Sequence, residues 1–480
     1  MKFINPILTS KGRRIGLALA LLFSCAASII AAPFIVTTTV DNGNNGSPTP
    51  GSLRAAINSV NAAVSTAINF NIPTSDPGYN ATNNTWTIQP PIDLPNIVNT
   101  VTIDGYTQPG SSVNTLTQGD NAMLTIILNG SNYTVGDGYV TGNGLHFAPL
   151  VSTSVNGSVV RGLVINQWLD NGILLDATNA AISGVSIVGN FFGTDASGTV
   201  QMANRTGIGL GATTTNAITG TLIGTVLLAD RNLVAGSFAI NYNDSYGVPG
   251  AGVGMANTTG TTIVNNYFGL DRTGTLALGN SLCAIQTSSD TNTIIGGTTT
   301  LTRNIISGQT LIGIDLIFST AGLIQGNYIG TDVTGTIPLG NGSSGIALYA
   351  APLNTIINNL ISGNGTGITI GDVGLVGSNQ NTVRGNKIGT DISGTRALSN
   401  TYFGIACEEG LNSISGNIIS GNLAGGILFN STFFAVNNTV SDNIVGLDIT
   451  GTKKIPNGGP GVQIGLNGGF GGALNNTIGG

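Results

Sequence analysis

The sequence has 480 residues, of which only 8% are charged, and it includes 73 glycines and a formal net charge of −6. Because 41% of the residues are hydrophobic and the net charge is small, a disordered chain is excluded, and collagen is excluded because glycine has no three-residue period. Beyond the N-terminus the Lys and Arg residues form no cluster except the pair Lys453–Lys454, which argues against nucleic acid or an anionic membrane as a partner.

The N-terminus has the three parts of a secretory signal peptide. Basic residues from Lys2 to Arg14 precede an apolar run from Ile15 to Phe23, and small residues follow it. We therefore predict that residues 1–31 are a signal peptide, that the protein is secreted or lies at the cell surface, and that the mature chain has no membrane span. A retained anchor and lipidation at Cys25 stay open as alternatives.

After processing, Cys283 and Cys407 are expected to remain. They lie 124 positions apart and hold different places in their repeats. This spacing does not resemble a disulfide framework, so we expect two small thiols buried in the core.

Residues 32–150 are expected to form an N-terminal cap and the first coils of the fold. The β-branched run from Phe34 to Val40 predicts an edge strand. The segment from Ser52 to Val64 predicts an amphipathic helix with Ser52 as its N-cap, because apolar residues recur at helical spacing. We expect this helix to cover the open end of a stack of strands, where backbone groups would otherwise be unpaired.

Two more strands are predicted before the repeats begin. The first is the alternating segment from Ala67 to Ile72, and the second lies in TVTIDGYTQPG, from Thr100 to Gly110. In that second segment Val101 and Ile103 alternate with polar residues, and the turn formers DGYTQPG end the strand.

Residues 151–480 contain five copies of a motif that reads GNYIGTDVTGTIPLGN in its clearest form, from Gly326 to Asn341. The Asp residues of the motif are Asp195, Asp271, Asp332, Asp391 and Asp448. An Asn lies five places before each of them, at Asn190, Asn266, Asn327, Asn386 and Asn443, and another lies nine places after, at Asn204, Asn280, Asn341, Asn400 and Asn457. Successive Asp residues are 76, 61, 59 and 57 positions apart, and a fixed period of this size indicates a solenoid.

Within each unit, short apolar runs end in Gly or Asn, which is typical of parallel strands and not of helices. A coil of a parallel β-helix takes roughly twenty residues, so we expect about three coils for each sixty-residue unit and about 14 Å between equivalent Asp residues. A second motif marks a different coil of the unit, and its copies are RNLVAG (231–236), RNIISG (303–308), NNLISGN (358–364) and GNIISGN (416–422).

The order of these segments makes the resemblance to a family specific. A strand, then GSLRAAI, INF and VTIDGYTQPG, followed by GTD–TGT repeats, resembles bacterial secreted right-handed parallel β-helix proteins with a CSLREA-type N-terminal motif, in the pectin-lyase-like superfold. Gly51 replaces the Cys of that motif. The resemblance implies an all-β solenoid with a short N-terminal capping helix and a surface location, and it brings no reaction with it.

We interpret the recurring Asn residues as a structural ladder, in which stacked amides hydrogen-bond along the axis; a row that binds carbohydrate is the alternative. The five Asp residues are expected to accept backbone N–H groups from the following Gly and Thr. Carboxylates 14 Å apart do not share a calcium ion, whose oxygen ligands lie within about 2.6 Å, so we predict neither a metal nor another cofactor.

No local pattern indicates a catalytic residue. The only His is His146, which alternates with Leu145 and Phe147 like an ordinary strand residue, and Glu408–Glu409 is expected to be a solvated bulge. No nucleophile elbow accompanies His146, and the Arg residues are scattered. A catalytic set assembled across coils stays open.

We therefore predict a non-enzymatic surface scaffold that binds glycans or other surfaces. The first alternative is a polysaccharide lyase or hydrolase, favoured by a cluster of Asp with Arg or Lys in a groove. The second is a structural spacer. The closing residues NNTIGG resemble the middle of a repeat, so we also expect the sequence to be truncated at its C-terminus.

Overall fold

The computed structural model describes residues 32–133, 142–238, 249–373, 377–430, 435–465 and 472–479. These residues belong to one compact unit, Ala32–Gly480. The predicted signal peptide, residues 1–31, lies outside the described residues. Within the described ranges, none of the helices has the length and apolar character needed to cross a membrane.

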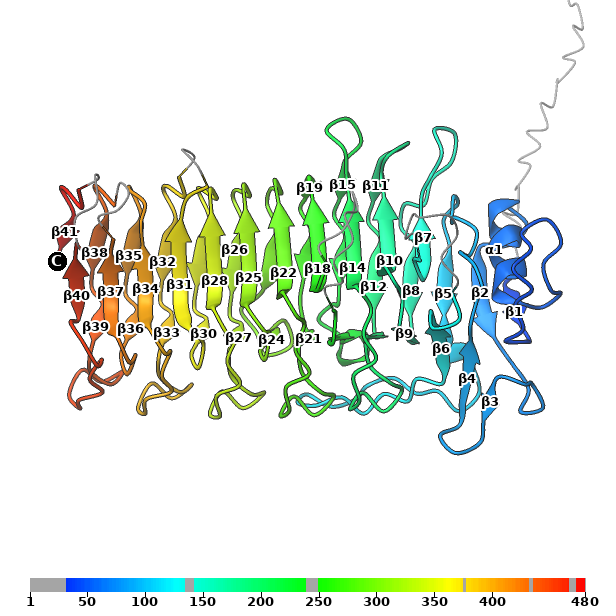
Figure 1. Ribbon diagram of the computed structural model, residues 1–480, viewed down its shortest axis with the longest axis horizontal. Coiled ribbons are helices and arrows are strands. Elements are labelled where there is room, and N and C mark those ends of the chain that lie inside the picture. The colour runs from blue at the N-terminus through cyan, green and yellow to red at the C-terminus, as the bar shows by residue number, and fades with distance from the viewer. Residues whose placement is uncertain are drawn as a thin grey trace, which may run out of the picture. The chain divides into compact units, whose positions relative to one another are not determined.

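The described chain winds through three long sheets and is a right-handed parallel β-helix, as predicted (Figure 1). The 14-stranded sheet A consists of β1 (Phe34–Val36), β2 (Ala67–Phe70), β5 (Thr102–Asp104), β8 (Val159–Arg161), β12 (Ser186–Val188), β16 (Leu222–Ile223), β20 (Thr262–Ile263), β23 (Ile294–Gly296), β26 (Leu323–Gln325), β29 (Thr355–Ile357), β32 (Thr382–Arg384), β35 (Ser413–Ser415), β38 (Thr439–Ser441) and β41 (Thr477–Ile478).

The 13-stranded sheet B consists of β3 (Tyr79–Asn80), β4 (Thr85–Ile88), β6 (Ile126–Asn129), β9 (Leu163–Asn166), β13 (Phe191–Phe192), β17 (Leu233–Val234), β21 (Tyr267–Phe268), β24 (Ile305–Ile306), β27 (Tyr328–Ile329), β30 (Leu360–Ile361), β33 (Lys387–Ile388), β36 (Ile418–Ile419) and β39 (Ile444–Val445). The pairing of β3 with β4 is antiparallel, and every other pairing between the described strands is parallel.

The 11-stranded sheet C consists of β7 (Leu145–Phe147), β10 (Asn171–Asp176), β14 (Thr206–Gly211), β18 (Ala251–Ala256), β22 (Cys283–Ser288), β25 (Ile312–Ile317), β28 (Ser344–Tyr349), β31 (Thr366–Gly371), β34 (Phe403–Cys407), β37 (Gly425–Phe429) and β40 (Val462–Ile464). A small sheet joins β11 (Ile182–Ser183), β15 (Ile218–Thr219) and β19 (Thr258–Thr259), and the 3-10 turns are η1 (Gly105–Thr107) and η2 (Leu228–Asp230).

The predicted capping helix is present as α1 (Leu53–Asn61), with the Ser52 side chain accepting a hydrogen bond from the Ala55 N–H at 3.2 Å. It packs against β1 and β2 at the first end of the stack (Figure 1). The helix ends three residues before Val64, which is 67% exposed and therefore not part of the buried stripe.

Each repeat spans two coils and not the predicted three. The repeat Asp residues follow β13, β21, β27, β33 and β39, and one further strand of sheet B lies between each successive pair. Equivalent Asp residues are therefore about 10 Å apart, from two strand spacings of about 4.8 Å. The prediction was wrong because it assumed too short a coil, and the long turns between the sheets add residues to each coil without adding strands. The second motif does fall on the intervening coils, at β17, β24, β30 and β36.

The core is built from columns of aliphatic side chains that stack from coil to coil. In sheet A one column runs through Ile263, Ile295, Ile324 and Ile356, each paired with the next in register and at most 1% exposed. Cys283 and Cys407 occupy buried places in sheet C and are free thiols, as predicted.

A long connection between η1 and β6, residues 112–124, crosses the outside of sheet B (Figure 1); we call it the strap. Its Asp120 N–H donates to the Arg272 carbonyl at 2.7 Å, and its Gly119 N–H donates to the Tyr267 hydroxyl at 2.8 Å. Arg272 returns hydrogen bonds to the carbonyls of Asp120 at 2.6 Å and Ala122 at 2.9 Å. The strap thus joins the first coils to the coil of β21.

The Arg of the GSLRAAI segment is a buried clamp. Arg54 is 0% exposed, and its guanidinium donates to Asp41 Oδ1 at 2.7 Å, to the Asp93 carbonyl at 2.7 Å and to the Ile92 carbonyl at 3.1 Å. The clamp ties α1 to the two loops that contain Asp41 and Asp93. In this chain the Arg of the GSLRAAI segment therefore has a structural role.

We predict that Arg54→Ala destabilises the cap strongly, because Asp41 is then left buried without its ion-pair partner. Breaking a buried pair by removing one member costs about 3–5 kcal/mol. Chemical denaturation measures the change, and Arg384→Ala, at an exposed arginine, is the control. Equal unfolding midpoints for the two variants would contradict the prediction.

The buried Asp290 makes stability depend on pH. It is 1% exposed, and its carboxylate accepts N–H groups from Thr258 and Ser288. Burial raises its pKa from 3.8 to about 6, against the opposing effect of these hydrogen bonds. Because the folded chain then binds the proton more tightly than the unfolded chain, stability falls as the pH rises from about 4 to about 6 and is level above that.

The expected loss in the free energy of unfolding is at most roughly 3 kcal/mol, because a tenfold change in proton affinity corresponds to about 1.4 kcal/mol. Calorimetric melting points measured between about pH 4 and about pH 7 test it, and Asp290→Asn should lack this part of the slope. An unchanged slope in that variant would assign the pH dependence to other groups.

Candidate active site

The Asn residues that precede each repeat Asp lie at the buried turns from sheet A to sheet B. They form one row with the Asn residues of the intervening coils: Asn190, Asn232, Asn266, Asn304, Asn327, Asn359, Asn386, Asn417 and Asn443. In each step the backbone N–H of one Asn donates to the side-chain oxygen of the next, at 2.9–3.3 Å. Asn327 also donates from Nδ2 to the Ile295 carbonyl at 2.8 Å.

At most of these turns the residue before the ladder Asn has a left-handed backbone conformation; Arg231 and Arg303, which precede two of the ladder residues, do not. Gly326 has a φ of 67°, Asn358 one of 56° and Asp442 one of 57°. Glycine, asparagine and aspartate tolerate this region best, which explains why the repeats read GN, NN or DN at this point.

The Asn residues nine places after each Asp lie at the turns into sheet C. Asn280, Asn341, Asn400 and Asn457 belong to a second row, which Gln309, Asn364 and Asn422 complete. Asn204 makes the same kind of contact, since its side-chain oxygen accepts the Trp168 N–H at 3.0 Å, but Ser237, whose N–H donates to Asn280, separates it from the row. A third row, through Asn354, Asn381, Asn412, Asn438 and Asn476, was missed by the sequence analysis because it lies outside the repeat motif.

Each repeat Asp closes the long turn between sheets B and C. Asp332 Oδ1 accepts N–H groups from Thr336 and Ile337, both at 3.1 Å, and the Thr334 hydroxyl at 2.9 Å. The other four bind the equivalent positions of their own turns: Asp195, Asp271, Asp391 and Asp448. The N–H of Gly335 donates to the Asp332 carbonyl and not to its carboxylate, so only the Thr part of the expected contact is found.

The Asp turns also bind one another. The Val333 N–H donates to the Gly274 carbonyl at 3.0 Å, and the Ile392 N–H donates to the Gly335 carbonyl at 3.0 Å. The turns thus form a second stack outside sheet B.

In the described part of the chain, a histidine and several carboxylates, which are groups able to transfer protons, lie together at a cleft of about 300 Å³ beside β7 and β10. His146 points outward from β7, between the buried Leu145 and Phe147, and its Nε2 lies 3.3 Å from Asp176 Oδ2. Both side chains are about one-fifth exposed. His146 is in register with Leu174 of β10, so Asp176 lies two residues further along the neighbouring coil.

Hydrogen bonds from Thr178 fix the Asp176 carboxylate in the position where it contacts His146. Its Oδ1 accepts the Thr178 N–H at 2.9 Å and the Thr178 hydroxyl at 2.5 Å. Burial tends to raise its pKa, but the hydrogen bonds from His146 and Thr178 outweigh burial and lower it. Asp176 is therefore an ionised partner that orients the imidazole.

Two more carboxylates line the same cleft. Asp170 Oδ1 lies 3.1 Å from Arg205 Nη1, and both side chains are less than 10% exposed. Asp93 Oδ2 accepts the Tyr133 hydroxyl at 3.2 Å, and its carbonyl is held by Arg54. The lining of the cleft comes from three segments far apart in the sequence, at Asp93, His146 and residues 170–176, which is why no local pattern predicted it.

Glu408 and Glu409 differ from the prediction of a solvated bulge. Glu409 is only 6% exposed, and burial, reinforced by Asp372 and Glu408, raises its pKa to about 7. Within the described part of the chain, no three His, Cys, Asp or Glu side chains are placed to hold a metal ion.

Comparisons with known proteins add a partial family match and distant folds. Residues 282–390 match the family model described as periplasmic copper-binding protein (NosD). That stretch contains one Cys, the buried Cys283, and neither His nor Met. Copper sites are built from thiolate, thioether and imidazole ligands, so the residues of the matched segment do not fit a copper site. No curated protein matches the chain.

Solved structures resemble the chain only in fold. The mannuronan C-5 epimerase AlgE6 A-module of Azotobacter vinelandii is 13% identical, with a TM-score of 0.38, and the match covers 93% of this chain and 99% of that one. The Dettilon tailspike protein is 13% identical, with a TM-score of 0.39 and coverage of 89% and 68%. A DFA-IIIase from Arthrobacter chlorophenolicus is 13% identical, with a TM-score of 0.30 and coverage of 80% and 75%.

The structural role of the Asn rows is a prediction that one variant tests. Asn327 is 0% exposed, so Asn327→Ala should leave the Asn304 N–H and the Ile295 carbonyl unpaired inside the protein. Each buried group left unpaired costs about 1–3 kcal/mol. We expect a clear fall in the melting temperature, measured against Asn179→Ala at an exposed loop position. Weaker glycan binding with an unchanged melting temperature would support the carbohydrate-binding alternative instead.

Proposed function

We propose that the protein is a secreted or cell-surface carbohydrate-active enzyme that cleaves a polysaccharide in the cleft formed by Asp93, His146, Asp170 and Asp176. The observation that carries this proposal is the contact between His146 and Asp176, set among further carboxylates in an open cleft. This cross-coil cluster favours the enzymatic alternative over a non-enzymatic scaffold or a spacer. The cleft volume of about 300 Å³ lies at the lower end of ligand sites.

The cleft contains a side chain that can transfer a proton and a carboxylate that stabilises its charged form. The imidazole of His146 exchanges a proton with the substrate, and the ionised Asp176 stabilises the imidazolium form. Asp93 faces the same space and is positioned by Arg54 and Tyr133. The carboxylates of the cleft, and the amides of Asn96 and Asn143 that also line it, can accept hydrogen bonds from sugar hydroxyls.

The charge of the cleft favours hydrolysis of a neutral glycan over lyase chemistry. Asp170 is neutralised by Arg205, while Asp93 and Asp176 are the other acidic groups lining the cleft. A uronate substrate would bring its own carboxylate towards these groups, and like charges in a cleft repel. Lyase action requires such a uronate, so a neutral sugar at this point fits better.

Purified residues 32–480 incubated with a panel of neutral and acidic polysaccharides test the proposal through the release of reducing or unsaturated ends. We expect reducing ends from a neutral glycan, and a loss of roughly 100-fold or more in His146→Ala, because general acid–base catalysis contributes about 10²–10⁴-fold. Asp176→Asn should lose activity as well, since the amide no longer stabilises an imidazolium.

The control is Gln463→Ala, at an outward position of β40 far along the same sheet. Product formation that survives both cleft variants would overturn the assignment of the site. Binding without product from any glycan would overturn the enzymatic proposal and support the scaffold.

A further inference from the structure

The outer face of sheet B contains a second candidate site, separate from the cleft over sheet C. A row of side chains runs in register from Tyr267 through Ile305, Tyr328 and Leu360 to Lys387. Two clefts, of about 260 Å³ and about 270 Å³, lie along this row, and Arg303 lines both. We call this surface, with Arg231, Arg303 and Lys387, the basic groove.

The groove has a charge opposite to that of the candidate active site. Arg231 and Arg303 line its first cleft, and Arg303 and Lys387 line its second; none of the described lining residues is acidic. The whole chain has only 15 Lys and Arg residues and a net charge of −6. Three cations on one face of such a chain make a local field that attracts anions.

Two of the cations have different tasks. Arg231 is 3% exposed and holds the strap, donating to the carbonyls of Leu116 at 3.2 Å and Thr117 at 3.0 Å. Arg303 lies over the Tyr328 ring, 4.0 Å from its centroid, and its Nε donates to the Gly326 carbonyl at 3.1 Å. These contacts fix the plane of the Arg303 guanidinium before any ligand arrives.

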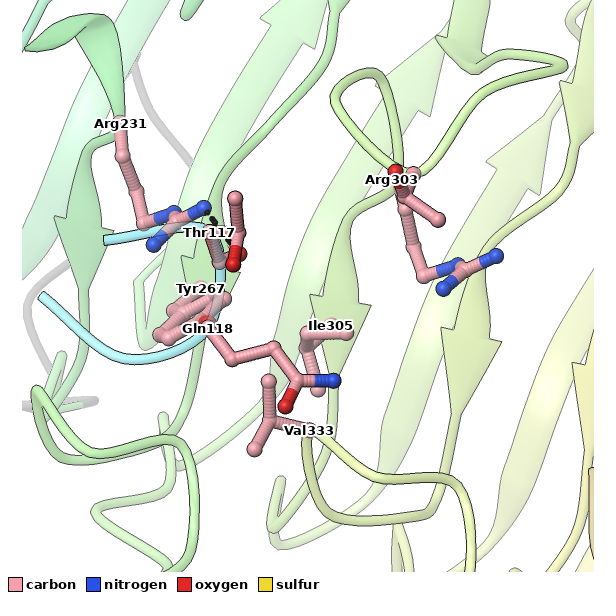
Figure 2. A pocket seen from close by; sticks show the side chains of 8 residues that line it. Thr117, Gln118, Arg231, Tyr267, Arg303, Ile305 and Val333 are labelled. Atoms are coloured by element: carbon pink, nitrogen blue, oxygen red, sulfur yellow. Dashed lines mark hydrogen bonds between the residues drawn. The ribbon is translucent and has the colours of Figure 1, made fainter. Parts of the chain in front are cut away.

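Arg303 and Lys387 are the cations available to a ligand. Neither has a carboxylate partner within the described part of the chain. Figure 2 shows the Arg303 guanidinium across the first cleft from Arg231, with Gln118 between them. A planar guanidinium held in this way matches the two oxygens of a carboxylate.

The shape of the groove indicates a polymer with hydroxyl groups. From β21 to β33 it crosses four strand spacings, or about 19 Å at about 4.8 Å each. Thr117, Gln118 and Thr300 place neutral hydrogen-bonding groups beside Arg303. Tyr267 is 2% exposed and Tyr328 is 7% exposed, so neither ring offers the open face on which single-stranded bases stack.

We propose that the basic groove binds an anionic polysaccharide whose carboxylates meet Arg303 and Lys387, while its hydroxyls contact the strap. This binding needs none of the groups in the cleft over sheet C. The protein then holds an acidic glycan on one face independently of the chemistry proposed on the other.

The test measures binding of polygalacturonate by titration calorimetry, with dextran as the neutral probe. We expect polygalacturonate to bind, dextran to bind at least tenfold more weakly, and the affinity to fall as salt is added. The double variant Arg303→Gln/Lys387→Gln should bind at least about tenfold more weakly, because it loses the charge-assisted hydrogen bonds to the carboxylates of the polymer. Lys387→Gln alone, which leaves the Arg303–Tyr328 stack intact, should show a smaller loss in the same direction.

Arg384→Gln is the matched control, because it removes the same charge from an exposed arginine of sheet A that lines neither cleft. His146→Ala should bind polygalacturonate like the unaltered protein, which separates this proposal from the fate of the proposed enzyme. Equal losses in Arg384→Gln and the double variant would overturn the groove. The proposal would also be overturned if phosphatidylglycerol vesicles, titrated in the same way, bound and polygalacturonate did not. Unchanged binding of polygalacturonate by folded variants of Arg303 and Lys387 would overturn it as well.

Discussion

From Asn190 to Asn443, at the turns from sheet A to sheet B, the N–H group of one ladder asparagine points along the stack to the amide oxygen of the next. These turns lie inside the protein, where an unpaired polar group costs several times what a paired one contributes. The side chain of Asn327 is 0% exposed and spans three coils through its partners Asn304, Asn359 and the Ile295 carbonyl. A slip of one residue would break these contacts and also move the aliphatic columns out of the core. The register of the coils from Asn190 to Asn443 therefore depends on this row.

The sequence predicted what is periodic and failed where contacts cross between coils. The helix beginning at Leu53, the strand beginning at Phe34 and the alternation of the two motifs follow from spacing and turn residues alone. The number of coils in a repeat did not, because the long Asp turns contribute residues without adding strands. The pairing of His146 with Asp176 depends on how much chain the intervening turn consumes, and no pattern within either segment records that length. Arg54 carried a visible signal, since an arginine in the buried stripe of a helix needs partners.

The same backbone presents two surfaces of opposite polarity. Beside β7 and β10 of sheet C, His146 and three carboxylates line one cleft; on sheet B, the Asp turns and the strap wall a groove that contains arginines and a lysine. The repeat fixes the positions along each face at intervals of one strand spacing. Local substitutions at outward positions change the charge of a face without touching the core, because inward and outward residues alternate along each strand.

The strap changes how the stack responds to force and heat. In a solenoid whose coils contact only their neighbours, the ends fray one coil at a time. Here Asp120 and Ala122 bind Arg272, far later in the chain, and the coils of β9, β13 and β17 lie beneath that connection. None of those coils opens alone without also breaking the hydrogen bonds between the strap and Arg272. The first half of the protein, up to β21, should accordingly melt as one cooperative block, with stepwise loss confined to the coils beyond β21.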